Sequence, residues 1–172
     1  MNEHSYIQSV HRRLPRSLYR WKINDSYQGG VADAYYSGPA GDLWVEYKYI
    51  KSLPKRPTSV VDLTNTRLLS TLQQHWLADR HKEGRNVAVV VGSDRGSIIL
   101  EGTDFQKTLT VETFIRNTVD TNGVALYIQG RTLHLERVNT PPIESADYEI
   151  PTNARSKGLS QQAKKYLEFE ES

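Results

Sequence analysis

The sequence predicts a mixed α/β fold, in which one sheet carries helices on its faces. The order of the segments is helix, three strands, helix and two further strands, which is typical of this class. Residues 86–92 (NVAVVVG) form a continuous apolar run, as expected of a strand covered on both faces. Residues 30–37 and 42–50 are rich in aromatic and β-branched residues, and the GPAG segment between them predicts a hairpin.

The elements before and after this hairpin follow from local signals. Residues 3–13 predict a short helix, because apolar residues recur at helical spacing until a proline ends the run (Ile7, Val10, Leu14 and Pro15). Residues 17–23 (SLYRWKI) have the composition of a strand. Residues 52–62 hold two prolines and two basic residues, so a loop is expected there.

Residues 64–82 predict the longest helix of the chain. Its apolar residues fall on one stripe, comprising Leu68, Leu69, Leu72, Trp76 and Leu77. Residues 97–102 (SIILEG) predict a further strand. Residues 110–119 predict a helix with Thr110 as its N-cap.

The C-terminal part of the sequence has a different character. Residues 125–138 alternate in polarity around Gly130, which predicts a second hairpin. Two prolines follow, so we divide the chain into a domain over residues 1–140 and a tail over residues 141–172, which ends in a candidate terminal helix. The tail holds four Lys/Arg against six Asp/Glu, so of the net charge of +2 the domain carries about +4. This mildly basic body permits a phosphate-rich partner.

Composition excludes several classes of protein. The 172 residues suit one domain with a real core, and the absence of cysteine excludes disulfides and thiolate metal sites and fits a cytoplasmic protein. The N-terminus has no apolar signal-peptide region, and no apolar segment is long enough to span a membrane. The five histidines form no metal-binding pair, and no glycine-rich phosphate loop or dinucleotide fingerprint is present, so no small-molecule cofactor is expected.

The predicted hairpin carries charged residues that are costly to bury without partners. Glu46 and Lys48 lie two apart in a strand, so they share one face, and Asp33 lies on the preceding strand. Two carboxylates, the backbone carbonyl of Tyr47 and waters form a typical Mg²⁺ environment. Lys48 beside such a site can orient water and stabilise charge on a phosphate. The alternative is an ordinary cross-strand Lys–Asp pair on a solvated sheet face.

Residues from both neighbouring helices are expected to reach the same cluster. Glu3 shares the inward face of the first helix and offers a third carboxylate. Gln73, in the segment LLSTLQQHW, approaches from the layer that flanks the sheet.

Taken in order, the helix Glu3, GGVAD, WVEYK, LQQHW and the buried VAVVVG strand resemble the PD-(D/E)XK nuclease superfamily. The nearest likeness is to small stand-alone VRR-NUC-type nucleases, common in phages, and it spans roughly residues 1–105. The resemblance implies a restriction-endonuclease-like sheet and a Mg²⁺-dependent phosphodiesterase, with Mn²⁺ as a substitute. It makes Asp33 and Glu46 metal ligands, Lys48 the catalytic lysine, Gln73 the supporting glutamine and Glu3 the helix acid. Ala32 stands where the family usually has proline, which costs only backbone stiffness.

Basic residues near these elements are candidates for binding the DNA backbone. They comprise Lys51, Lys55 and Arg56 after the Glu-x-Lys strand, and Arg12 and Arg13 near the end of the first helix. A solvated charge run, or cations that stabilise a helix C-terminus, is the alternative.

The likeness to enzymes that recognise DNA shape implies a Holliday-junction-resolvase-like endonuclease. A junction has two scissile strands, which favours a homodimer, with residues 105–172 as candidate dimerisation or junction-binding elements. A sequence-specific restriction-type enzyme and a non-catalytic DNA-binding or assembly protein remain alternatives. RNA is a further substrate that the sequence leaves open.

Overall fold

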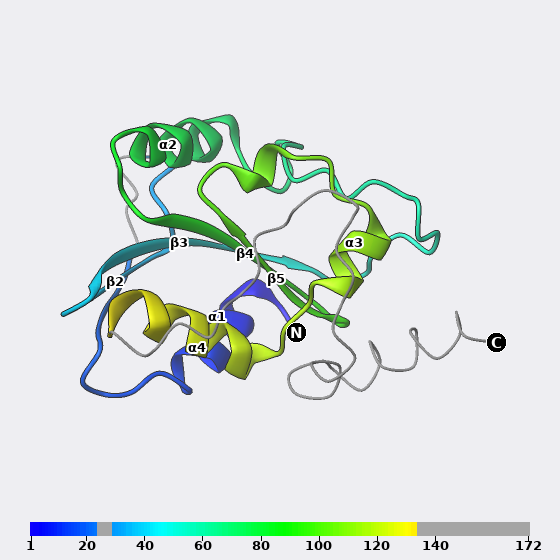
Figure 1. Ribbon diagram of the computed structural model, residues 1–172. Coiled ribbons are helices and arrows are strands. Elements are labelled where there is room, and N and C mark those ends of the chain that lie inside the picture. Colours follow the sequence, from blue (N-terminus) through cyan, green and yellow to red (C-terminus); the bar gives the residue numbers. More distant parts are fainter. Residues whose placement is uncertain (24–28, 134–172) are drawn as a thin grey trace, which may run out of the picture.

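The computed structural model describes residues 1–23 and 29–133 and builds them around one mixed sheet (Figure 1). The strands are β1 (Tyr19–Lys22), β2 (Ala34–Gly38), β3 (Gly41–Ile50), β4 (Val87–Ser93) and β5 (Gly96–Glu101). Their order across the sheet is the same as their order along the chain. The helices are α1 (Glu3–His11), α2 (Thr71–Lys82), α3 (Val111–Arg116) and α4 (Thr121–Thr132), with a short 3₁₀ turn at Asp104–Gln106. The expected mixed sheet with flanking helices is therefore confirmed. The predicted tail at residues 141–172 and its terminal helix lie outside the described residues.

Strands β1, β2 and β3 form an antiparallel meander. The β2–β3 register pairs Ala34 with Val45 and ends at Gly38 and Gly41, which close the predicted hairpin. The β2–β3 pairing stops at Ala34, whereas β3 continues to Ile50. The far half of β3 therefore has one edge that no described strand covers.

Strand β3 pairs with β4 in parallel, which requires a crossover connection. Helix α2 lies on this crossover and packs on β4. The first six residues of β4 are buried, as expected for a strand covered on both faces. Strand β5 pairs antiparallel with β4 and completes the sheet.

Two apolar layers enclose the sheet, one on each face. Helices α1 and α4 cover the face that carries Tyr36, Val45 and Tyr47. Helix α2, α3 and the segment before α2 cover the opposite face over β4 and β5, where Val89 and Val91 are buried. No helix in the described ranges is long and apolar enough to cross a membrane.

The predicted second hairpin at residues 125–138 is wrong, because its first half forms the end of helix α4. The Asp120 side chain caps this helix by accepting from the backbone N–H of Gly123. Buried residues Val124 and Ile128, four apart, pack against the sheet, so the local alternation in polarity reflects one helical stripe. Gly130 lies inside the helix, with open space where a Cβ would stand.

Helix α2 also differs from its predicted extent of residues 64–82. It begins at Thr71, because Ser70 adopts an extended backbone and caps the helix. Of the predicted apolar stripe, Leu69 and Leu77 are buried and Leu68 and Trp76 pack against the same core, but Leu72 is 60% exposed. Leu68 and Leu69 precede the helix, so the five residues do not form one helical stripe. This short polar helix exists because of its cap and of Leu77 and Trp76, which pack toward β4.

Candidate active site

Strand β3 places Glu46 and Lys48 on the same face, as the two-residue period predicts. The Lys48 Nζ lies 2.6 Å from Glu46 Oε1. The Glu46 side chain is fully buried and that of Lys48 is 12% exposed, so the pair is an ion pair largely removed from water. Burying two charges in this way destabilises the fold unless further partners compensate.

Asp33 occupies the open edge of β3, one residue before β2 begins. Its Oδ2 accepts a hydrogen bond from the backbone N–H of Tyr47 at 2.8 Å. The β2–β3 register, extended by one residue, sets Asp33 opposite Glu46. The N–H and C=O of one strand residue leave on the same side, so the Tyr47 carbonyl also faces this edge.

Gln73 reaches the site from the first turn of α2. Its Nε2 donates to Glu46 Oε1 at 2.5 Å, while its Oε1 accepts from the backbone N–H of Ser70 at 3.0 Å. Ser70 Oγ in turn accepts from the Gln73 backbone N–H, which completes a capping box. The amide oxygen of Gln73 thus accepts a hydrogen bond from the helix cap, and its amide nitrogen donates to the Glu46 carboxylate.

Glu3 approaches from the start of α1 and lies at the edge of the cluster. Its Oε2 is 3.9 Å from Lys48 Nζ, and its side chain is 42% exposed. A capping box between Asn2 and Ser5 holds this end of the helix. Partial burial raises the pKa of Glu3, against the effect of Lys48 and with a contribution from Asp33.

Burial dominates the electrostatics of the central pair. It raises the pKa of Glu46 to about 8, reinforced by the charge of Asp33 and only partly offset by Lys48. Burial alone would lower the pKa of Lys48, but the carboxylates of Glu46 and Glu3 more than compensate and raise it. Lys48 is therefore an ammonium group at neutral pH, which acts through its charge and its N–H donors.

One atom of this cluster has no partner. Glu46 Oε1 accepts from both Lys48 and Gln73, but Glu46 Oε2 is buried and forms no hydrogen bond. Buried carboxylate oxygens nearly always have a partner, so this oxygen is a position for a proton or for a bound cation. A divalent cation held by Glu46, Asp33 and the Tyr47 carbonyl fits the position, because these are the hard oxygen donors that Mg²⁺ prefers.

The donor set is small. Over the described residues, no group of three or more His, Cys, Asp or Glu side chains converges closely enough to form a metal site by itself. Mg²⁺ is commonly held by one or two carboxylates and retains several waters, so Asp33 and Glu46 are sufficient in number. The structure brings Glu3 to Lys48 and gives it no contact with either of these carboxylates.

The chain was compared with protein families, curated proteins and solved structures. No protein-family model matches the chain, and no curated protein matches it. Among solved structures it is similar to Hjc of Archaeoglobus fulgidus, a Holliday junction resolvase from an archaeal hyperthermophile. The TM-score is 0.42 at 15% identity, over 73% of this chain and 97% of that chain. The function proposed below therefore rests on the site's own side chains.

The predicted DNA-binding residues fall into two groups. Lys51, Lys55 and Arg56 are exposed on the segment that directly follows β3, within a few residues of Lys48. Arg12 and Arg13 are exposed at the C-terminal end of α1, about 13 Å along the helix from Glu3. Arg13 donates to the backbone carbonyl of Ser9 and so stabilises the helix end, and both arginines lie apart from the carboxylates.

Two supporting features were missed from the sequence. Ser70 was placed inside a helix, although Ser-x-x-Gln before a helical segment is the signature of a capping box. Behind the site, Tyr47 Oη is hydrogen-bonded to Tyr36 Oη at 2.8 Å, which is bonded to His11 Nε2 at 2.7 Å. Burial lowers the pKa of His11 to about 4, so the ring is neutral and this network anchors β3 to α1.

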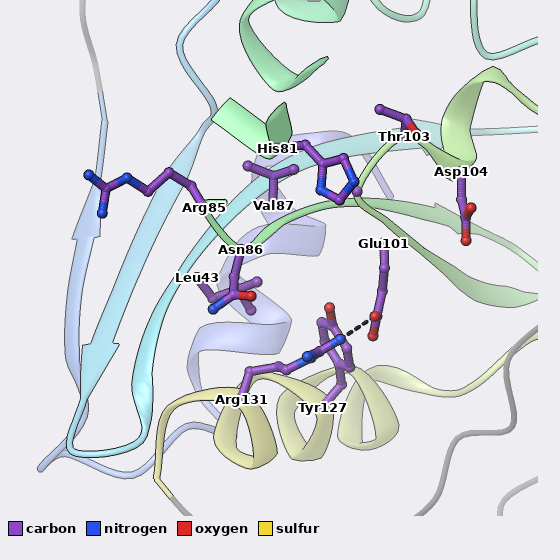
Figure 2. A pocket seen from close by; sticks show the side chains of 11 residues that line it. Leu43, His81, Arg85, Asn86, Val87, Glu101, Thr103, Asp104, Tyr127 and Arg131 are labelled. Atoms are coloured by element: carbon purple, nitrogen blue, oxygen red, sulfur yellow. Dashed lines mark hydrogen bonds and ion pairs between the residues drawn. The ribbon is translucent and has the colours of Figure 1, made fainter. Parts of the chain in front are cut away.

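A separate cavity of about 320 Å³ lies at the other end of the sheet (Figure 2). Its walls come from the start of β4, the end of β5, and helices α2 and α4, with Asn86, Glu101, Tyr127 and Arg131 among them. Arg131 forms an ion pair with Glu101 across it. None of the predicted site residues lines this cavity, so it plays no part in the chemistry considered below.

Proposed function

We propose that this chain is a Mg²⁺-dependent phosphodiesterase that cleaves DNA internally. The observation that supports this most strongly is Glu46 Oε2, which is buried and has no hydrogen-bond partner. The other oxygen of the same carboxylate binds the Lys48 ammonium. A structural ion pair has no need of a second carboxylate and an unpaired oxygen. A site for a cation next to a fixed positive charge suits an anionic phosphodiester.

Each residue has a distinct part in this mechanism. Asp33, Glu46 and the Tyr47 carbonyl hold the ion, which when bound lowers the pKa of water and neutralises phosphate charge. Lys48 is charged and partly open to solvent, so its N–H groups orient the attacking water and stabilise negative charge on the scissile phosphate. Gln73 fixes the Glu46 carboxylate through Oε1 and leaves Oε2 available.

The substrate class extends the proposal beyond the carboxylates. The exposed Lys51, Lys55 and Arg56 follow β3 and are suited to contact the DNA backbone without reading its sequence. We infer a structure-selective endonuclease of the Holliday-junction-resolvase type, acting as a homodimer. A sequence-specific restriction-type enzyme is the second enzymatic candidate, and it would leave discrete bands on plasmid DNA.

A cleavage panel tests this function. Four-way junctions, flaps, nicked duplex and linear duplex are incubated with the protein, with and without Mg²⁺. We expect Mg²⁺-dependent cleavage that Glu46→Gln abolishes and Asp42→Asn leaves unchanged. Asp42 is an exposed carboxylate on the same strand and face, so it is a matched control.

Calorimetry with Mg²⁺ separates the enzyme from a non-catalytic DNA-binding protein on the same fold. If the chain is the enzyme, the wild-type protein binds Mg²⁺ and the Glu46→Gln variant does not. Undiminished cleavage by Glu46→Gln, or no Mg²⁺ binding to the wild-type protein, would contradict the proposal.

A further inference from the structure

Aromatic side chains lie in a row across the sheet on the face that carries Glu46, where strand pairing places Trp21 next to Tyr35. We call this the aromatic row; it consists of Tyr19 and Trp21 on β1, Tyr35 on β2, Trp44 on β3 and Trp76 on α2. Ring centroids lie 6.3 Å apart between Tyr19 and Tyr35, 4.5 Å between Tyr35 and Trp44, and 5.2 Å between Trp44 and Trp76. All three tryptophans of the chain belong to this row.

The strand register places the aromatic row directly beside the carboxylates. Trp21 pairs with Tyr35, and Tyr35 pairs with Trp44. Two residues further along the same strands, the extended register aligns Asp33 with Glu46. Two residues of a strand span about 7 Å, so the aromatic rings and the carboxylates occupy adjacent positions on one face.

The β1 end of the aromatic row is open to solvent, whereas Trp44 and Trp76 pack against the core. Tyr19 is 60% exposed and Trp21 is 53% exposed, because the helices on this side pack over β4 and β5. Figure 1 shows α2 on this side of the sheet and α1 and α4 on the other. Exposed large aromatic residues that lie together mark an interaction surface more often than single exposed residues do.

Charge on both sides of the carboxylates favours a nucleic acid as the occupant. The guanidinium of Arg80, which also forms an ion pair with Glu83, lies 5.9 Å from the Trp76 ring centroid at one end of the row. Beyond Glu46, Lys48 is followed by the exposed basic residues of the segment after β3. Aromatic rings beside cations form the usual platform for single-stranded nucleic acid, where bases stack and phosphates pair with positive charge.

We propose that the aromatic row stacks unpaired DNA bases next to the scissile phosphate. The substrate is therefore DNA with unpaired bases at the cleavage point, such as a flap or the opened branch point of a junction, because the bases of an intact duplex are stacked on one another and cannot lie on the rings. This inference rests on the proposed function for the position of the phosphate. The binding itself is independent of cleavage.

Binding is measured without divalent metal on the full chain carrying Glu46→Gln, so that no cleavage intervenes. The probes are a short oligo-thymidine strand, an abasic strand of the same length and charge, and a blunt duplex. We expect oligo-thymidine to quench the tryptophan fluorescence and to bind at least tenfold more tightly than the abasic strand. The duplex is expected to cause little quenching.

Variants locate the effect, with binding followed by anisotropy of a labelled strand. Trp21→Ala is expected to weaken oligo-thymidine binding roughly tenfold, the loss of about one stacked base, while Trp21→Phe retains most of the affinity. Leu126→Ala is the matched control, because Leu126 is 47% exposed on α4, on the other side of the sheet.

Equal affinity for the oligo-thymidine and abasic strands, or no effect of Trp21→Ala, overturns the proposal. If the row is instead an interface with a second copy of this chain, Trp21→Ala reduces self-association in sedimentation experiments and leaves strand binding unchanged, which also overturns it. Base-dependent binding with no cleavage by the wild-type chain in Mg²⁺ would refute the proposed enzyme and retain the stacking surface.

Discussion

Gln73 donates its amide N–H to Glu46 Oε1 at 2.5 Å and is itself fixed by the N-cap of α2 through its amide oxygen. The buried carboxylate is therefore oriented by a residue that the helix needs for its own start. Because the same side chain serves the helix and the site, small changes at the α2 N-terminus reach the proposed chemistry.

Gln73→Ala should impair metal binding and cleavage together. The substitution removes one of the two donors to Glu46 Oε1, so the carboxylate loses its orientation. Loss of such a supporting hydrogen bond typically reduces metal affinity or activity about 10- to 100-fold. Mg²⁺ titrations of cleavage measure the effect.

Gln74→Ala is the control for this substitution. Gln74 is the next residue of the same helix and donates to the carbonyls of Thr64 and Leu69, away from the carboxylates. If both alanine variants lower activity equally, Gln73 acts only through helix stability.

Lys48→Met should reduce cleavage at saturating Mg²⁺ by about 100-fold or more, the usual contribution of a positioned proton-transfer or charge-stabilising group. Mg²⁺ affinity should fall little or rise, because the ammonium and the cation repel one another. Turnover and metal affinity are measured separately by single-turnover assays and calorimetry. Lys82→Met, which changes an exposed lysine in the last turn of α2, should leave turnover unchanged. A wild-type rate for Lys48→Met would refute the role of Lys48.

The stability of the metal-free protein should depend on the proton of Glu46. Its pKa is raised from an ordinary value of 4.5 to about 8, so between these values the folded protein binds one more proton than the unfolded chain. The stabilising contribution is complete below about pH 4.5, falls by about 1.4 kcal/mol per pH unit as pH rises, and is lost above about pH 8.

Glu46→Gln should remove this slope and make the metal-free protein more stable than wild type at pH 9. Added Mg²⁺ should stabilise wild type alone, with release of a proton, because the ion neutralises the carboxylate. Denaturant unfolding between pH 6 and 9 tests both points. Parallel pH profiles for the two proteins would mean that Glu46 titrates normally.

Ser70→Ala should weaken the α2 cap and loosen Gln73. The expected loss of stability is about 1 kcal/mol, typical of an N-cap. Cleavage should also fall by several fold, since the Ser70 cap and Gln73 restrain one another. Ser70→Thr preserves the hydroxyl and should restore both properties; activity that recovers without stability would separate the two roles.

The centre of the site could be predicted from the sequence because it depends on local periodicity. Glu46 and Lys48 share a face in any regular strand, and a short hairpin brings Asp33 close to them. What could not be predicted is that β2 begins only at Ala34, which leaves the Tyr47 N–H and carbonyl on an edge that no described strand pairs with. Strand length in a sheet depends on tertiary pairing, which local patterns do not encode.

The errors have a related cause. Residues 125–138 alternate in polarity over a short stretch, and this period is ambiguous when a helical stripe contains only a few buried residues. The N-cap Asp120, which resolves the ambiguity, lies outside that stretch. The exposure of Trp21 could not be predicted from the sequence either, because it depends on which strands the helices on that face leave uncovered.

The parallel pairing of β3 with β4 has a consequence for synthesis of the protein. Gln73 lies on the crossover, and Glu46 pairs with Val89 of β4, a strand that ends at Ser93. While the chain is still emerging from the ribosome and lacks β4, the Glu46 carboxylate is hydrated and disconnected from its partners. The proposed hydrolytic activity therefore arises only after the crossover has closed.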